Sequence, residues 1–308
     1  MNDFIVFSGN ANRNLANSIV RLLQVPLGEC AIERFPDGEI SVSLGEPVRG
    51  REVFIIQPTS PPVNDHLVEF LAIVDACRRS AARRITAIIP YFGYSRSDKR
   101  HGRREPIMAS MVALLLQAVG IDHVVSVDLH AAQIEGFFHI AVDTLSAVPV
   151  LSDALSKRLP DDAVIVSPDE GGVKMATHYA QQLGAAVAVI HKQREGGAET
   201  RVLHVVGNVR DRPSVIIDDM ISTGGTVGGS VDALLEAGAR PEIYVVATHG
   251  LFLPGSREKL SHEAVREILV TDTVTVESWH GLAVVSIAPL IASAIARLAG
   301  AGRLATIQ

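Results

Sequence analysis

The sequence predicts an α/β fold built from two similar domains, each a mostly parallel sheet flanked by helices. Strand-like apolar runs alternate with helical segments along the chain, which is the pattern of parallel-sheet α/β domains. Segment 74–93 (VDACRRSAARRITAIIPYFG) also resembles segment 231–250 (VDALLEAGARPEIYVVATHG) without a gap, each reading as a helix followed by a strand. Chance similarity between two such units remains the alternative, but the repeat favours two related domains.

The strand-like runs follow one another from the amino terminus, and most of their apolar residues belong to the predicted cores. They are FIVF (4–7), VFIIQ (53–57), ITAIIP (85–90), VVSVDL (124–129), AVIVSP (163–168), AVAVI (186–190), SVIID (214–218) and IYVVAT (243–248). The chain of 308 residues is long enough for two ordinary domains. Because Pro149 interrupts the pattern before a new helical segment, we place the domains at residues 1–145 and 146–308.

Composition excludes several classes of protein. The formal net charge of -6 gives no overall basic surface for a nucleic acid partner. No window approaches the roughly 20 apolar residues needed to cross a membrane, so we expect no membrane role. Cys30 and Cys77 form neither a disulfide framework nor a zinc motif, which favours a reducing cytoplasm.

The first candidate site is the stretch RFPDGE at residues 34–39. Pro-Asp-Gly is common in turns, so a plain turn explains it when it is taken alone. As a site, the ring of Phe35 would stack on a base, while carboxylates such as Asp37 and Glu39 would accept hydrogen bonds from its amino group.

A basic segment, YSRSDKRHGRREP, follows at residues 94–106, between a strand and a predicted helix. A solvated run of charge is the usual explanation of such a cluster. In an acidic chain, its arginines, Arg96 among them, are also candidates to clamp the polyphosphate of a nucleotide or to bind a regulatory phosphate.

Two further strand ends carry candidate metal ligands. His130 follows VVSVDL, which places Asp128 and His130 on the same side of an extended chain, and Asp169 lies in the stretch SPDEGG (167–172). A lone histidine such as His130 is usually structural. A neighbouring carboxylate and Asp169, which is a suitable ligand for a magnesium ion, make a metal site the other interpretation.

Lys192 and Arg194 lie in HKQREGGAET (191–200), a polar segment with paired glycines that we expect to be mobile. Cations on a mobile loop can close over a reacting phosphate and neutralise the charge that develops on it. An ordinary hairpin loop is the alternative.

The stretch VIIDDMISTGGT (215–226) is the most specific pattern in the chain. Hydroxyls, glycines and a helix start suit a phosphate. Asp218 and Asp219 repel phosphate and instead suit hydroxyl groups or a metal ion. A sugar phosphate satisfies both halves.

Together these motifs resemble the ribose-phosphate pyrophosphokinase family. They occur in nearly collinear order over almost the whole chain, from FSGNANRNLA (7–16) through RFPDGE, VDLHAAQIEGFF (127–138) and VSPDEGG (166–172) to IDDMISTGGT (217–226). The resemblance implies two phosphoribosyltransferase-like domains, with the last segment packing back on the first. It also implies the transfer of a diphosphoryl group from ATP to ribose 5-phosphate, with Mg2+ as cofactor.

The resemblance assigns roles by position, in four groups. The ATP-binding positions are Phe35, Asp37, Gly38, Glu39, Arg96 and Ser97. The metal positions are His130 and Asp169, and the catalytic positions are Lys192 and Arg194. The ribose 5-phosphate positions are Arg194, Asp218, Asp219, Ser222, Thr223, Gly224, Gly225 and Thr226.

Three residues depart from the common pattern of the family. Ser97 stands where glutamine is usual, Glu170 where histidine is usual and Ser222 where aspartate is usual. They put activation by phosphate and inhibition by ADP in doubt, so we expect weak or absent allosteric control.

The family also forms homo-oligomers, in which RFPDGE reaches the ATP site of a neighbouring copy. Two alternatives to a synthetase remain: a phosphoribosyltransferase, which needs only the last motif, and a non-catalytic PRPP-binding regulator. The regulator would be expected to lack Lys192 or the metal positions, and both are present.

Overall fold

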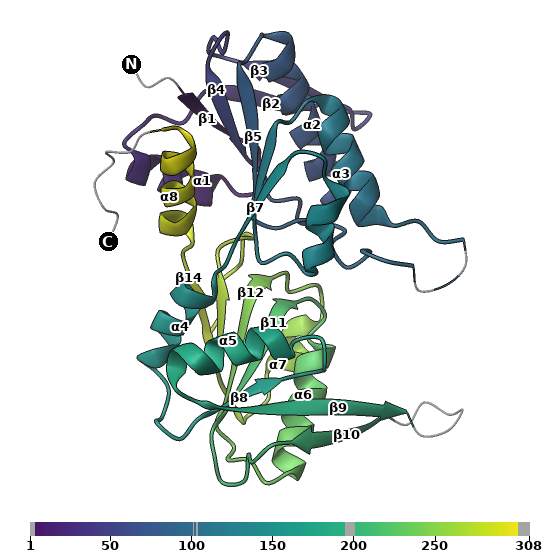
Figure 1. The fold of residues 1–308 in the computed structure, drawn as a ribbon, viewed down its shortest axis with the longest axis vertical. Helices are drawn as coiled ribbons and strands as arrows, with labels where there is room; N and C mark the ends of the chain where they lie inside the picture. The colour runs from purple at the N-terminus through teal and green to yellow at the C-terminus, as the bar shows by residue number, and fades with distance from the viewer. Residues whose placement is uncertain (1–3, 101, 103, 195–200, 301–308) are drawn as a thin grey trace. The chain divides into compact units, whose positions relative to one another are not determined.

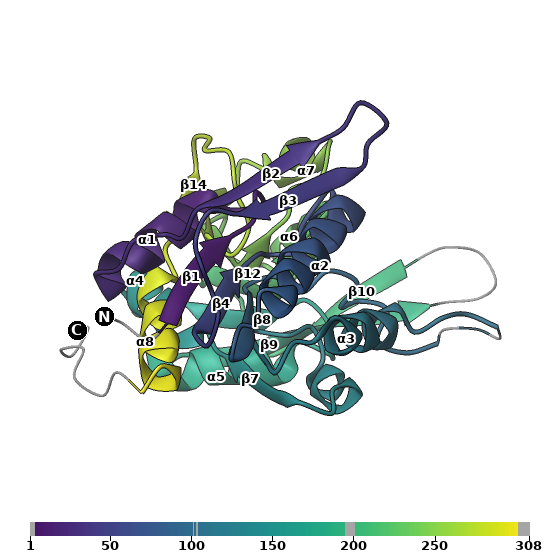
Figure 2. The same ribbon diagram turned by 90° about the horizontal axis from the view of Figure 1, so that it is seen from above.

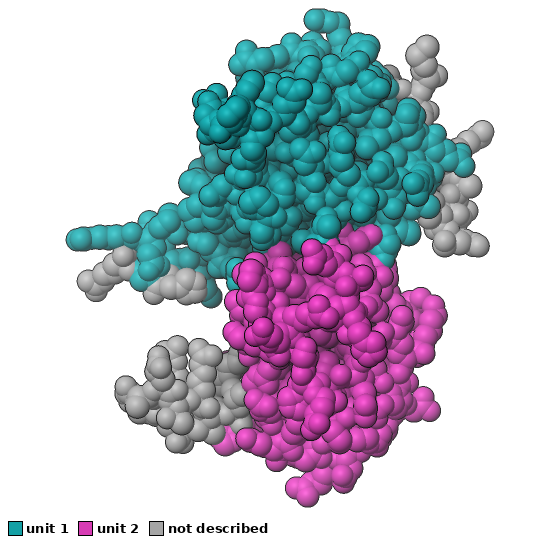
Figure 3. Space-filling model, turned by 180° about the vertical axis from the view of Figure 1, so that it is seen from behind, with its two compact units in different colours: residues 1–146, 273–275, 286–308 teal, residues 147–272, 276–285 magenta. Residues whose placement is uncertain are grey.

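The computed structural model describes residues 4–100, 102, 104–194 and 201–300, without the side chains of residues 192–194 and 201–203. The chain divides into two compact units, shown in different colours in Figure 3. Unit 1 is Met1–Ser146, Thr273–Thr275 and Ser286–Gln308, and unit 2 is Ala147–Asp272 and Val276–Val285. The carboxyl-terminal part of the chain thus returns to the unit formed by the amino-terminal part.

Unit 1 contains a parallel sheet and a separate hairpin (Figure 1). Within the described residues its sheet has the order β1-β4-β5-β6-β7, and all neighbouring strands are parallel. These strands are β1 (Phe4–Ser8), β4 (Glu52–Ile56), β5 (Arg84–Ile89), β6 (His123–Val127) and β7 (Ala141–Leu145). The hairpin strands are β2 (Cys30–Arg34) and β3 (Ile40–Leu44), and the helices are α1 (Arg13–Leu23), α2 (Val63–Arg79), α3 (Met108–Val119), η1 (Ala132–Phe137) and α8 (Ala288–Leu298).

The core of unit 1 follows the two-residue alternation of its strands. Phe7 of β1 and Ile55 of β4 share one apolar cluster with Phe70 of α2 and Leu116 of α3. Helices α1 and α8 pack against each other, although they lie at opposite ends of the sequence (Figures 1 and 2).

Unit 2 has a larger sheet, with the order β10-β9-β8-β11-β12-β13-β14 among the described residues. Only the β9–β10 pair is antiparallel there. The strands are β8 (Val164–Ser167), β9 (Ala186–Arg194), β10 (Arg201–Val206), β11 (Ser214–Ile221), β12 (Ile243–Gly250), β13 (Val265–Thr271) and β14 (Leu282–Val285), and the helices are α4 (Val148–Ser156), α5 (Val173–Leu183), α6 (Gly225–Glu236) and α7 (Ser256–Leu260). The predicted α/β class with mostly parallel sheets is confirmed.

The two units repeat one order of elements. In unit 2 this order starts after α4. In each unit a strand is followed by a helix, an antiparallel hairpin, a second strand, a second helix and further parallel strands. The hairpin forms a separate sheet in unit 1, whereas β9 joins the main sheet beside β8 in unit 2. The hairpins are β2–β3 in unit 1 and β9–β10 in unit 2, so RFPDGE and residues 191–194 lie on hairpins at the same place in the order of elements. Segment 74–93 runs from α2 into β5, and segment 231–250 runs from α6 into β12, the strand that follows the second helix of this order.

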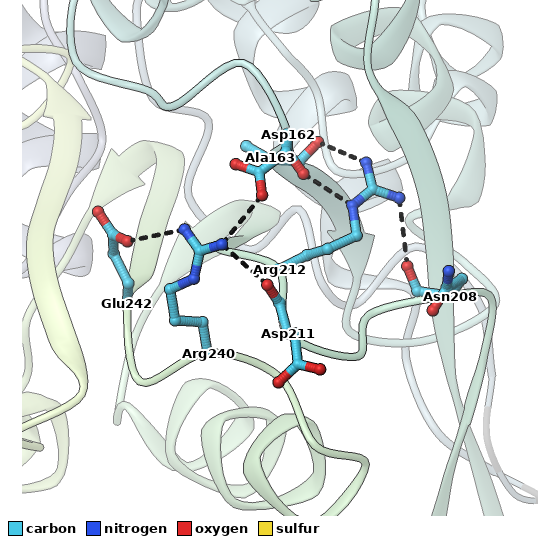
Figure 4. A network of polar contacts seen from close by, with 7 residues as sticks. All are labelled: Asp162, Ala163, Asn208, Asp211, Arg212, Arg240 and Glu242. Carbon is cyan, nitrogen blue, oxygen red and sulfur yellow. Dashed lines mark hydrogen bonds and ion pairs between the residues drawn. The ribbon is translucent and has the colours of Figure 1, made fainter.

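The amino ends of the strands in unit 2 are joined by a polar network (Figure 4). Arg240 Nη2 donates to Asp162 Oδ2 over 3.0 Å and to Asp211 O over 2.9 Å. Arg212 Nε donates to Asp162 O over 2.7 Å. These arginines pair with the loops before β8 and β11, so this edge serves stability and the opposite edge is left for ligands.

Among the helices that the structure describes, none has both the length and the apolar character that a membrane span requires.

Candidate functional site

The carboxyl end of β11 carries the most specific predicted motif. The strand runs to Ile221, three residues beyond the predicted run, because it continues to pair with β12, where Ile221 lies opposite Gly250. Its other neighbour, β8, pairs with it only as far as Ile216. Asp218 and Asp219 therefore extend past the end of β8 at the edge where open α/β sheets bind ligands.

The loop after β11 has the geometry of an anion site. Helix α6 begins at Gly225, and Gly224 caps it with a φ of 75°, a conformation that favours glycine. A Cβ atom on Gly224 would lie 3.0 Å from Ser256 O, so the space beside this residue is also closed. Thr223, Gly225 and Thr226 are exposed at the helix start, where N–H groups and the helix dipole favour negative charge.

Ser222 lies at the start of this loop. Its buried Oγ atom has no hydrogen-bond partner among the described residues. Because unpaired buried hydroxyl groups are costly, a ligand oxygen that reached this atom would stabilise the loop.

Asp218 and Asp219 form a pair of like charges. Burial raises the pKa of Asp218 above the ordinary carboxyl value of 3.8, and the charge of Asp219 raises it further. The more distant charge of Asp169 acts in the same direction, while the Asp219 N–H, which donates to Asp218 Oδ1 over 2.9 Å, opposes it. A cation or a hydroxyl donor placed here would relieve this repulsion.

The SPDEGG loop between β8 and α5 lies at the same edge of unit 2. The Gly172 N–H donates to Asp169 Oδ1 over 3.1 Å, and Ser167 Oγ donates to Asp169 O over 2.6 Å. Glu170 Oε1 lies 2.6 Å from His191 Nδ1, which ties this loop to β9. Glu170, a departure from the family pattern, therefore has a partner on the hairpin strand that carries Lys192.

Lys192 and Arg194 lie on β9 rather than in the loop that we expected. Lys192 pairs with Leu203 and Arg194 with Arg201 in the antiparallel ladder. The hydrogen bonds to β10 extend the strand through both positions, although the positions of their side chains are not among those that the structure describes. The remainder of the predicted loop, residues 195–200, lies outside the described residues.

RFPDGE forms the tip of the β2–β3 hairpin in unit 1. The Phe35 N–H donates to Glu39 O over 2.8 Å, and the Gly38 N–H donates to Phe35 O over 2.9 Å. Gly38 has a φ of 96°, and the Glu39 N–H donates to Asp37 Oδ1 over 3.1 Å. The Phe35 ring is 49% exposed, so it contributes little to the core and is accessible to a ligand.

The basic segment joins β5 to α3. Arg96, Lys99, Arg100 and Arg104 are exposed, and Arg103 lies outside the described residues. Ser97 has a structural role: its Oγ accepts a hydrogen bond from the Met108 N–H over 3.3 Å, and its carbonyl oxygen accepts one from the Ala109 N–H over 3.1 Å. Ser97 thus fixes the start of α3, a function that its sequence neighbours did not reveal.

Asp128 and His130 follow the end of β6. Asp128 is buried with a φ of 37°, a conformation uncommon outside glycine and frequent at functional sites. His130 is exposed. In the part of the chain that the structure describes, no three His, Cys, Asp or Glu side chains converge to hold a metal ion. Mg2+ usually takes one or two protein carboxylates and completes its coordination with water and substrate phosphates, so Asp169 stays a suitable single carboxylate donor.

Residues 251–253 support the site but were not recognised from the sequence. The Leu251 and Phe252 N–H groups donate to Ile221 O over 2.9 and 3.2 Å, and the Leu253 N–H donates to Ser222 O over 3.0 Å. The sequence nearby offers the Pro254-Gly255 dipeptide, which predicts a turn. It does not predict that residues 251–253 bond to Ile221 and Ser222.

Comparison with known proteins gives one consistent family. The chain matches the family model for the N-terminal domain of ribose phosphate pyrophosphokinase over residues 4–120, and the model for the phosphoribosyl synthetase-associated domain over residues 196–306. Curated relatives named ribose-phosphate pyrophosphokinase, from Thermotoga maritima and Agrobacterium fabrum, are 42% and 44% identical to it. These alignments cover 96% of this chain and 95% and 96% of the relatives.

One solved structure agrees over the full length. The phosphoribosylpyrophosphate synthetase from Mycobacterium smegmatis is 39% identical and superposes with a TM-score of 0.92, covering 97% of this chain and 99% of that chain. The similarity thus extends over both units.

We predict that Asp218→Asn stabilises the ligand-free protein at neutral and alkaline pH. The folded state keeps the Asp218 proton to higher pH than the unfolded state, so wild-type stability falls as pH rises above 3.8. Asparagine cannot ionise, and its side chain can still accept from the Asp219 N–H. The gain in unfolding free energy should be at least about 1 kcal/mol near pH 8, the order of one pKa unit, and should vanish near pH 4.

Urea unfolding without substrates or divalent cations measures this difference. Asp232→Asn, which removes an exposed carboxylate from the surface of α6, is the matched control. If Asp218→Asn is less stable than the wild type at pH 8, the carboxylate is ionised and favourably placed.

Proposed function

The chain belongs to the ribose-phosphate pyrophosphokinase family and has the activity for which the family is named, and we propose how its residues perform that reaction. The substrates are ATP and ribose 5-phosphate, and the products are AMP and 5-phosphoribosyl 1-diphosphate (PRPP). The observation that carries the proposal is the end of β11, where two carboxylates are followed directly by an anion-binding loop and a helix start. A sugar phosphate has hydroxyl groups for the two carboxylates and a phosphate anion for the loop and the helix start.

Residues 222–226 bind the 5-phosphate through backbone N–H groups and hydroxyls. The exposed positions of Thr223 and Thr226, the unpaired hydroxyl of Ser222 and the start of α6 support this assignment. Asp218 and Asp219 accept hydrogen bonds from the ribose hydroxyls. The sugar hydroxyls then lie beside the carboxylates and the phosphate lies away from them, which limits repulsion.

ATP binds through the basic segment of unit 1 and the hairpin tip that a neighbouring copy of the chain supplies. Phe35 stacks on the adenine, Asp37 and Glu39 accept from its amino group, Gly38 shapes the turn, and Arg96 pairs with the phosphates. Ser97 contributes by fixing the segment to the start of α3.

His130, after β6 of unit 1, and Asp169, after β8 of unit 2, would each contribute to the binding of Mg2+ and substrate phosphates. When bound, the ion would neutralise part of the negative charge of the phosphates.

The cytoplasm is the location that the chain favours. Cys30 and Cys77 are free thiols, and the substrates are phosphorylated.

The reaction needs positioning and charge stabilisation rather than a covalent nucleophile. The anomeric oxygen of the ribose bonds to the β-phosphorus, and the bond from that phosphorus to the oxygen bridging the α-phosphate breaks, which releases AMP. Lys192 and Arg194, on the β9–β10 hairpin, neutralise the charge that develops in this step, and Arg194 also contacts the sugar phosphate. The Glu170–His191 contact links this hairpin to the loop that carries Asp169.

Phosphorus NMR of a mixture of protein, ATP, magnesium and ribose 5-phosphate tests the function. AMP and a sugar diphosphate should form in equal amounts, because the diphosphoryl group is transferred intact. Formation of ADP would mean simple phosphoryl transfer. Absence of turnover would favour a PRPP-binding regulator, and PRPP consumption with a free base would favour a phosphoribosyltransferase.

We predict that Phe35→Ala raises the KM for ATP about tenfold, because stacking of a base on an aromatic ring contributes about 1–3 kcal/mol. Stability should change by less than about 0.5 kcal/mol, since the ring is largely exposed. Phe35→Trp keeps a stacking surface and serves as the control. An unchanged KM for ATP in Phe35→Ala would remove this ring from the nucleotide site.

The same family implies self-association, and the surface of α3 supports it. Met111, Leu114 and Leu115 are exposed large apolar side chains, 40%, 54% and 40% accessible, on one face of a helix whose other face belongs to the core. With Ala118 they follow the spacing i, i+3, i+4 and i+7 of a continuous helical stripe. An exposed apolar stripe of this kind is typical of an interface, and we propose a second copy of the chain as its partner.

Leu114→Glu should therefore lower the sedimentation coefficient of the protein at micromolar concentration, because a charge would be buried at the interface. Leu22→Glu, at an exposed leucine on α1, is the control and should sediment as the wild type. A wild-type protein that sediments as a monomer, or a Leu114→Glu variant that assembles normally, would contradict the proposal.

A further inference from the structure

The segment after β12, Leu251–Leu260, supports the phosphate loop along its length. Three successive N–H groups, of residues 251 to 253, bond to the carbonyl oxygens of Ile221 and Ser222 at distances of 2.9 to 3.2 Å. At the middle of the loop, a Cβ atom on Gly224 would lie 3.0 Å from Ser256 O and 3.3 Å from Leu260 Cγ. The loop is thus held from one side by a segment that contributes no predicted ligand contact.

Phe252 occupies an unusual conformation at the centre of this segment. Its φ is 39°, in the left-handed region that bulky residues rarely adopt. The chain is tightly folded here, since a Cβ atom on Gly250 would lie 2.5 Å from the Phe252 ring. Such a conformation persists only where surrounding contacts enforce it.

The Phe252 ring contacts the ring of Trp279, from the connection between β13 and β14. The two rings are 4.6 Å apart between centroids and meet edge to face at 84°. The Arg257 guanidinium lies 5.7 Å from the centroid of the same tryptophan ring. Arg257 follows Phe252 in the chain, after the Pro254-Gly255 turn. Both kinds of contact are attractive, and together they join residues 252, 257 and 279.

We propose that Phe252 and Trp279 are positioning residues for the sugar 5-phosphate. Their edge-to-face contact holds Leu251–Leu253 against Ile221 and Ser222. The N–H groups of the phosphate loop are thereby fixed in the arrangement that binds the anion. This inference rests on the proposed function of residues 222–226. It assigns a role in substrate affinity to two aromatic residues that do not touch the substrate.

Steady-state kinetics of Phe252→Ala and Trp279→Ala test the proposal. The KM for ribose 5-phosphate should rise about tenfold, as expected for the loss of an aromatic pair. The KM for ATP and the kcat at saturation should stay within about twofold, because a misplaced loop mainly weakens binding of the sugar phosphate. Trp279→Phe keeps an aromatic partner and should restore the KM.

Two further variants keep the test decisive. Phe252→Leu retains apolar volume if the alanine variant fails to fold, and it should still raise the KM for ribose 5-phosphate. Arg240→Ala, at the opposite edge of the sheet, should leave the KM unchanged (Figure 4). Equal changes in the KM of both substrates, or a wild-type KM in Phe252→Leu and Trp279→Ala, would overturn the positioning role.

Fluorescence separates this inference from the proposed function. Trp279 is the one tryptophan in the sequence, so the tryptophan fluorescence of the protein reports on its contact with Phe252. Ribose 5-phosphate should change the emission saturably, unmodified ribose should not, and Phe252→Ala should shift the midpoint to higher concentration. A saturable change without turnover would refute the proposed reaction and support the aromatic contact, whereas normal turnover with an unchanged midpoint in Phe252→Ala would refute the positioning role alone.

Discussion

The burial of Asp218 beside a second carboxylate, Asp219, is the constraint on which the rest of the site depends. Two carboxylates at the end of a buried strand destabilise the ligand-free protein, and Asp169 adds a third negative charge nearby. Evolution towards stability alone would remove such a pair. Its presence indicates a ligand that supplies hydroxyl donors or a cation, and the anion of that ligand must then lie elsewhere. The loop at residues 222–226 provides that separate place, directly after the carboxylates.

This separation depends on unequal strand lengths. Because β11 continues beside β12 after β8 has ended, the aspartates lie at the open edge of the sheet, and the phosphate loop lies one turn further along. Residues 251–253 then hold the end of β11 and the start of the loop by backbone hydrogen bonds. The amino edge of the same sheet has a different character, since Arg212 and Arg240 join its loops and stabilise the unit.

Repetition of the fold explains how one chain carries two kinds of binding element. Each unit inserts an antiparallel hairpin after its first strand and helix. In unit 1 the hairpin ends in the exposed Phe35, which suits a base. In unit 2 the strand of the hairpin carries Lys192 and Arg194, which suit phosphate charge. The same place in the order of elements therefore carries different chemistry in the two units.

The sequence by itself determined the features that depend on local pattern. Apolar runs predicted parallel strands, Pro-Asp-Gly predicted the turn at Gly38, and the stretch from Asp218 to Thr226 predicted a sugar-phosphate site, because each depends on neighbouring residues. Tertiary structure decided the features that need a distant partner. Pairing with β10 placed Lys192 on a strand. A hydrogen bond from Met108 gave Ser97 its structural role.

The same reason explains the contacts that pattern could not reveal. Glu170 meets His191, and Phe252 meets Trp279, across stretches of chain whose separation no local pattern encodes. Periodicity and turn chemistry specify where an element begins and which face it buries. Which side chains then meet depends on how the sheet brings separate elements together, and only the folded chain determines that.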